Sequence, residues 1–146
     1  MGDIAFNVSK ASVGYYAGLP ATNDALVAVV LEAAGLEADS VLTDYDTLSA
    51  ILAAASNEQT TMGRKTLASV TATVDDTNNR VDITATDLSW SAASGNDTGA
   101  VVICYDPDTT TGTDADLIPL SKHDFVASPS GGTLSFALST GFLRVS

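Results

Sequence analysis

The sequence predicts a mainly β protein: a single domain with a sandwich or barrel-like β core, one short helix and an N-terminal arm. Threonine and serine are abundant while lysine and glutamate are few, and β-branched side chains fit a pleated surface. Short apolar runs recur with turn-forming residues about every ten positions, as in sandwiches and barrels. The length of 146 residues suits one domain, 1–146, with residues 1–24 as a possible arm and loop.

The N-terminal part predicts an arm, a loop and a buried strand. Residues 4–8 alternate apolar and polar, as a half-buried strand does, and a terminal strand becomes ordered only when it is paired. We therefore expect this arm to contact a neighbouring copy in a homotrimer. Residues 14–23 form a loop with Gly, Pro and Asn. Residues 25–31 are all apolar, which indicates a strand buried on both faces or packed in an oligomer.

One helix is predicted after this strand. Asp46 is the expected N-terminal cap, and the helix is expected to end near residues 56–57. Its apolar stripe is short, so we expect it to cover one edge or face of a sheet. The stripe consists of Leu48, Ile51, Leu52 and Ala55.

From residue 64 onward the pattern is one of strands and turns. The turn-forming cluster 75–79 separates strand 65–74 from strand 81–85, which predicts a hairpin. Residues 101–105 are the strongest candidate for a core strand. The remaining strands are expected at 88–90, 117–120, 125–126, 134–138 and 141–145.

Charge and composition argue against several classes of partner and location. Eighteen acidic residues against six basic ones give a formal net charge of -12, which disfavours nucleic acid because phosphate is bound mainly by Lys and Arg. No apolar run approaches the ~20 residues of a membrane span. The first residues lack a basic segment and a long apolar segment, so we expect no signal peptide, and the lone Cys104 allows no intrachain disulfide. A lone thiol suits folding in a reducing cytoplasm.

The residues with reactive side chains do not predict an enzyme. His123 adjoins Asp124, but no G-x-S-x-G motif provides a nucleophile, so a surface or capping role is expected for His123. One His and one Cys cannot form a zinc cluster. Cys104 lies in an apolar strand and is expected to be a buried hydrophobe. We predict no catalytic residue and no cofactor.

An acidic loop, residues 106–116, is the sharpest candidate for a ligand site. Carboxylates and hydroxyls are the ligands that calcium prefers, but the spacing is not that of an EF-hand. The alternative is a solvated loop whose Asp and Thr side chains bond their own backbone, and we predict no metal. The turn at Asp75-Asp76 is a weaker candidate. The four loop carboxylates are those of Asp106, Asp108, Asp114 and Asp116.

Four aromatic residues leave two interpretations open. Their rings offer surfaces on which sugars stack, but such residues more often anchor a core or an interface. They are Trp90, Tyr15, Tyr16 and Tyr105.

Several segments resemble small virion proteins of tailed phages. The resemblance covers most of the chain from about residue 26 onward. The segments are LEAD at 36–39, DYDTL at 44–48, NEQTT at 57–61, DDTNNRVD at 75–82, VICYDPD at 102–108 and GFLR at 141–144.

This resemblance implies a capsid decoration (cement) role: binding to the major capsid protein on the outside of the shell. An acidic surface agrees with an exterior position, away from packaged DNA. Three alternatives remain open from the residues alone. They are a tail-tube or tail-associated subunit, a carbohydrate-binding virion module that uses Trp90 or the tyrosines, and an unrelated soluble β domain.

Overall fold

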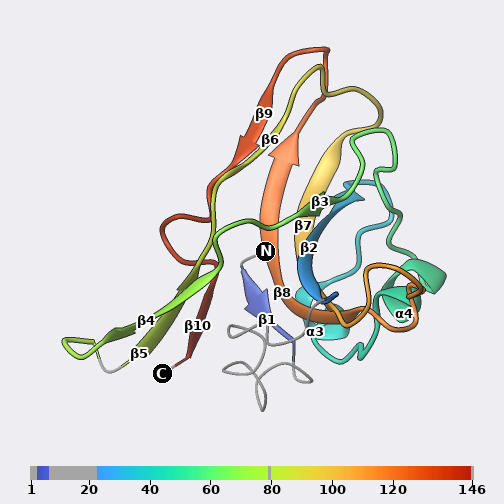
Figure 1. Ribbon diagram of the computed structural model, residues 1–146. Helices are drawn as coiled ribbons and strands as arrows, with labels where there is room; N and C mark the ends of the chain where they lie inside the picture. The colour runs from blue at the N-terminus through green and yellow to red at the C-terminus, as the bar shows by residue number, and fades with distance from the viewer. Residues whose placement is uncertain (1–2, 7–22, 79, 146) are drawn as a thin grey trace.

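The computed structural model describes residues 3–6, 23–78 and 80–145, and within them the chain is mainly β, as predicted. All strand pairs are antiparallel. The largest sheet has the strand order β1-β8-β7-β2-β3 and does not close into a barrel (Figure 1). Its strands are β1 (Ile4–Ala5), β2 (Ala25–Glu32), β3 (Lys65–Thr66), β7 (Thr98–Asp106) and β8 (Ile118–Ala127).

Two smaller sheets pack against one face of the large sheet. One has the order β10-β5-β4 and the other pairs β6 with β9. Their shared core with the large sheet includes Ile83, Trp90 and Phe142. The strands are β4 (Thr71–Asp75), β5 (Arg80–Thr84), β6 (Leu88–Trp90), β9 (Leu134–Phe136) and β10 (Leu143–Val145).

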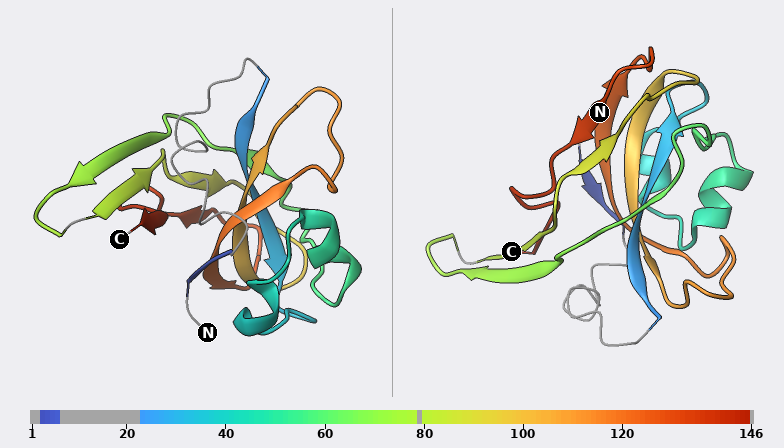
Figure 2. Two further views of the ribbon diagram at one scale, coloured as in Figure 1. Left: turned by 90° about the horizontal axis from the view of Figure 1, so that it is seen from below. Right: turned by 45° about the horizontal axis from the view of Figure 1, so that its top comes forward.

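Two short helices, α3 (Asp39–Leu42) and α4 (Leu48–Ala53), cover the opposite face of the large sheet (Figure 2). Leu48 and Ile51 of α4 pack in a second core with alternate residues of β2 and β7. The large sheet is therefore a central layer with a core on each side. This explains why residues 25–31 are apolar throughout, and the prediction of a strand buried on both faces is confirmed.

The helical region differs from the prediction in three details. The cap of α4 is Thr47, whose hydroxyl accepts a hydrogen bond from Ala50 N at 3.2 Å, rather than Asp46. The helix ends at Ala53, short of residues 56–57. Helix α3 was not predicted, because a single turn that buries only Leu42 has no helical periodicity to detect.

Two strand boundaries also differ. The segment 65–74, predicted as one strand, divides into β3 and β4 in different sheets, with Ser69 between them at a φ of 54°. The segments 117–120 and 125–126 form one continuous strand, β8. Its middle, Ser121-Lys122-His123-Asp124, is polar in sequence, yet Ser121, Lys122 and His123 are buried in the fold.

The predicted hairpin 65–85 is present as β4 and β5, and it projects from the body (Figures 1 and 2). Of the predicted N-terminal strand 4–8, Ile4–Ala5 pairs with β8 of the same chain, and Phe6 is buried. Residues 7 and 8 of the expected arm, and most of the predicted loop 14–23, lie outside the described residues.

Candidate functional site

The lone cysteine lies in the core, as predicted. Cys104 is on β7 and packs on the helical side of the sheet. Burial raises the pKa of its thiol, so the thiolate needed for nucleophilic chemistry is disfavoured.

Two of the four candidate sugar-stacking aromatics are buried. Trp90 packs in the core, and its Nε1 donates a hydrogen bond to Gly63 O at 3.1 Å. Tyr105 is also buried, and its hydroxyl donates to Asp24 Oδ2 at 3.0 Å. Neither ring has a face that a sugar can reach, so both act as core anchors. Tyr15 and Tyr16 lie outside the described residues.

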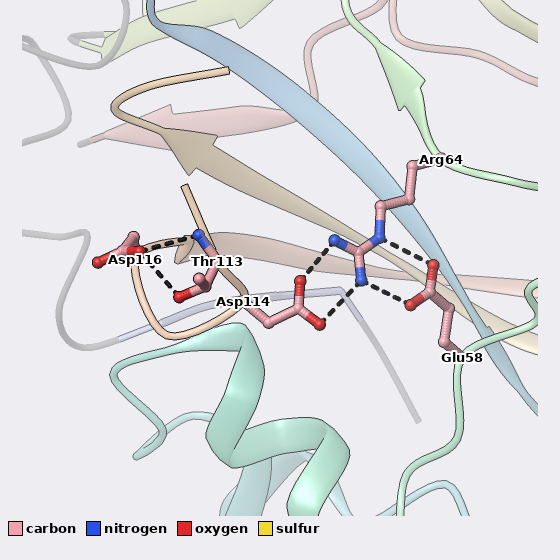
Figure 3. Close-up of polar contacts among 5 residues, drawn as sticks. All are labelled: Glu58, Arg64, Thr113, Asp114 and Asp116. Carbon is pink, nitrogen blue, oxygen red and sulfur yellow. Dashed lines mark hydrogen bonds and ion pairs between the residues drawn. The ribbon is translucent and has the colours of Figure 1, made fainter. Parts of the chain in front are cut away.

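Within the acidic loop 106–116, the carboxylates bind groups of the protein itself. Asp108 accepts hydrogen bonds from Thr110 N at 2.9 Å and from the hydroxyls of Thr110 and Thr111, each at 2.5 Å. Those hydroxyls, Thr110 first, lower the pKa of Asp108 to about 2. Asp116 accepts from the N and Oγ1 of Thr113, both at 2.9 Å (Figure 3). These are the local turns that Asp and Thr commonly form.

Asp106 Oδ1 accepts a hydrogen bond from Asp108 N at 3.1 Å. The remaining loop carboxylate, that of Asp114, points in another direction, toward Arg64 (Figure 3). Arg64 Nη1 lies 2.6 Å from Asp114 Oδ1, and its Nη2 lies 2.7 Å from Glu58 Oε2. The hydrogen bond from Arg64 lowers the pKa of Asp114, and the two carboxylates raise the pKa of Arg64. One guanidinium therefore ties the loop to the segment before β3.

The same loop is also docked on the beginning of α4. The backbone N–H groups of Leu48 and Ser49 donate to Leu117 O and Asp114 O, each at 2.9 Å. These are N–H groups that a helix cannot satisfy itself. The loop is therefore a structural element that caps a helix. Across the described part of the chain, no three His, Cys, Asp or Glu side chains converge as metal ligands.

His123 makes a polar contact that the sequence did not suggest. Its Nδ1 lies 2.9 Å from Asp3 Oδ2, and its Nε2 lies 3.0 Å from Ser121 Oγ. The expectation of a surface position was wrong: the side chain is buried, because β8 turns it toward Phe136 of β9. Asp124, its neighbour in sequence, instead pairs with Lys122.

This Asp3–His123–Ser121 network has the order of contacts of a catalytic triad and borders a cavity of about 230 Å³. Ser121 lies within a strand rather than on a sharp turn, and it is 1% exposed. Asp3 Oδ1 also accepts from Asp124 N at 3.1 Å. Burial acts to raise the pKa of Asp3, but its hydrogen bonds from His123 and Asp124 outweigh this and lower it. The geometry fits a structural role, in which the contacts of Asp3 with His123 and Asp124 hold the N-terminal strand on β8.

Lys122 forms a second buried contact on the other face of β8. Its Nζ lies 3.0 Å from Asp39 Oδ1 on α3 and also pairs with Asp124, and the side chain is fully buried. Burial acts to lower the pKa of Lys122, but the two carboxylates outweigh it and raise it. Without these two carboxylates the buried charge of Lys122 would be uncompensated. Lys122 therefore fixes the position of α3 on the sheet.

The projecting β10-β5-β4 sheet has one polar and one apolar face. On the polar face, Arg144 pairs with Asp82, and Arg80 pairs with both Asp82 and Asp75. The register places Val74 beside Val81 on the other face. Val74 is 67% exposed, so the outer part of this apolar face is uncovered. Sequence alternation predicts the two faces, but only the fold shows which part of the apolar face has no layer over it.

No helix in the described residues is long and apolar enough to cross a membrane. Comparisons with protein-family models, with curated proteins and with solved structures found no match to this chain.

Proposed function

We propose that this chain is a decoration protein of a tailed-phage capsid. It binds the major capsid protein on the outside of the shell as a homotrimer and stabilises the particle, after synthesis in the cytoplasm of the host. The observation that supports the proposal is a difference between the body of the protein and the projecting hairpin. The candidate reactive groups of the body bind one another, whereas a hairpin with an uncovered apolar face projects from it.

Internal pairing of these groups suits a structural subunit better than an enzyme. Arg64, Lys122 and His123 each contact a carboxylate from a distant part of the chain. Such contacts hold loops and helices on the sheet and leave these side chains little freedom to bind a ligand. A rigid body loses little conformational entropy when it is bound, which favours a contact that is repeated many times.

The charge of the chain supports a position on the exterior of the shell. With a net charge of -12, the protein is repelled by packaged DNA, whose phosphates carry the same sign. The resemblance to small virion proteins points to the same location. Each contact with the shell need contribute only a few kcal/mol, because many copies acting together stabilise a lattice through multivalency.

Particles with and without the protein test the proposal. We expect particles that lack it to release DNA at a lower temperature, and purified protein added back to restore the heat resistance. Quantitative mass spectrometry should find hundreds of copies per particle, and labelled antibody should decorate the head. Equal heat resistance of both particles, with the label confined to the tail, would contradict the proposal and favour a tail subunit.

A further inference from the structure

In the part of the chain that the structure describes, no strand pairs with the outer edge of β4. Strand β4 lies at the end of its sheet, and among the described residues it pairs with β5 alone. Natural edge strands usually carry a Lys, a Pro or a bulge that prevents pairing with another chain. Strand β4 has no Lys or Pro, its pairing with β5 is continuous, and its one charged residue, Asp75, is paired with Arg80. Such an edge is ready to accept another strand.

The face beside this edge is also uncovered. Ala72 and Val74 point to the apolar side of the hairpin, and both are exposed. An exposed apolar surface next to an open edge favours contact with a second strand that presents apolar residues in the same register.

The local charge allows a second acidic copy to approach here. The whole chain carries a net charge of -12, but the β10-β5-β4 sheet and its turn contain three acidic and two basic residues, a net charge of -1. Most of these charges are already paired within the sheet. Self-repulsion between two copies is therefore weak at this hairpin compared with the rest of the surface.

We propose that β4 of one copy pairs with β4 of a second copy, antiparallel and symmetric about Thr73. In this register Thr71 lies opposite Asp75 and Ala72 opposite Val74, so no two like charges face each other. The two apolar faces become one continuous surface in a six-stranded sheet. The contact is isologous, as in most twofold dimers.

The contact is expected to be weak and reversible in solution. A stable interface buries about 800 Å² on each partner, more than five-residue strands supply. The contact does not involve β1, which pairs with β8 of the same chain. It does not depend on binding to a capsid, so it is testable with the purified protein.

A pair of cysteine variants tests the symmetry axis. In Thr73→Cys the two thiols lie opposite each other, whereas in Thr71→Cys they are offset by four residues, about 13 Å along the strands. A Cα separation beyond about 7 Å cannot be bridged, so T73C should form the disulfide dimer at least ~10-fold faster than T71C. Both positions are exposed on the same face, and the native Cys104 is buried. Equal rates would overturn the proposal.

A charge variant tests the contact without a cross-link. In Thr73→Lys the new side chain lies beside Asp82 within the monomer, which favours folding, but two lysines face each other in the dimer. Sedimentation over a range of concentrations should show that the mass of the wild type rises with concentration, whereas T73K stays at a lower mass. An unchanged mass would contradict the β4 contact. Capsid binding by T73K is a separate measurement, so failure of this contact and failure of the decoration role are distinguishable.

Discussion

The central strand β7 and the hairpin strand β4 show two ways in which this chain uses β structure. Strand β7 is buried on both faces, between the two helices and the smaller sheets. Strand β4 alternates Thr with Ala or Val, and four of its five residues are exposed. The first pattern requires a layer on each side. The alternating pattern of β4 needs a layer over its apolar face only, and the fold supplies that layer only to the inner half of the hairpin.

The ion pairs of the body and of the hairpin differ in how far apart their partners lie in the sequence. In the body, Arg64, Lys122 and His123 bind carboxylates 50 or more residues away in sequence. In the hairpin, Arg80 pairs with Asp75 and Asp82, which are close neighbours along the chain. The pairs of the body therefore fix tertiary structure, whereas most of those in the hairpin stabilise a local unit. The body is therefore held together by contacts between distant segments, whereas the hairpin is held mainly by pairs within its own sheet.

A matched pair of Val→Ala substitutions should give the largest difference between the two regions. Val101 of β7 is fully buried, so V101A should lower the free energy of unfolding by about 2–3 kcal/mol through lost burial and a cavity. V74A removes the same atoms from an exposed site and should change it by less than about 0.5 kcal/mol. Urea unfolding measures both. Similar losses would mean that the apolar face of the hairpin is covered.

A matched pair of Arg→Met substitutions should give a smaller difference. R64M removes the tie between the acidic loop and residue 58, and we expect a loss of about 1 kcal/mol, typical of a good surface network. Hydrogen exchange should accelerate in the loop and at the start of α4. R144M disrupts an exposed pair of the hairpin and should leave exchange in the body unchanged.

The pH dependence of the stability of R64M tests whether the Arg64–Asp114 pair acts through charge. The folded-state pKa of Asp114 is lowered, so its contribution to stability is present above the ordinary carboxyl pKa of about 4 and is lost as the pH falls through the folded value. Without Arg64 the main cause of this shift disappears. The difference in stability between wild type and R64M should therefore shrink at low pH. A constant difference from neutral to acidic pH would show that the pair does not act through charge.

A titration of Asp108 should show whether hydrogen bonds within the acidic loop lower the pKa of its carboxyl group. NMR of the side-chain carboxyl should give a pKa of about 2, and T110V should raise it, because Thr110 is the main donor. T113V serves as the control, since the Thr113 hydroxyl donates to Asp116 instead. An ordinary pKa for Asp108 in the wild type would show that the loop is not held in this conformation.

Metal removal should have no effect. We expect the melting temperature to be the same with excess calcium and with a chelator, because the loop carboxylates already have partners within the protein. A rise of several degrees with calcium would indicate binding to the folded state. It would also make Asp106, Asp108, Asp114 and Asp116 candidate ligands.

The sequence alone predicted the features that depend on local pattern. A run without polar residues at 25–31 implied burial on both faces, and the turn cluster at 75–79 placed the hairpin. Cys104 was expected in the core because it lies within an apolar strand. Periodicity and turn chemistry act between residues that are near neighbours in the chain, so a single sequence reports them well.

The tertiary structure decided the features that depend on distant segments. The carboxylates that pair with His123, Arg64 and Lys122 cannot be found from sequence spacing, because each lies on a different element. The residues around a carboxylate do not indicate which cationic side chain it will contact. The polar centre of β8 was not predicted as strand, since the contacts of His123 with Asp3 and of Lys122 with Asp39 form only in the folded chain. Which apolar face stays uncovered was likewise settled by how the layers pack, because burial is a property of the assembled sheets rather than of any one strand.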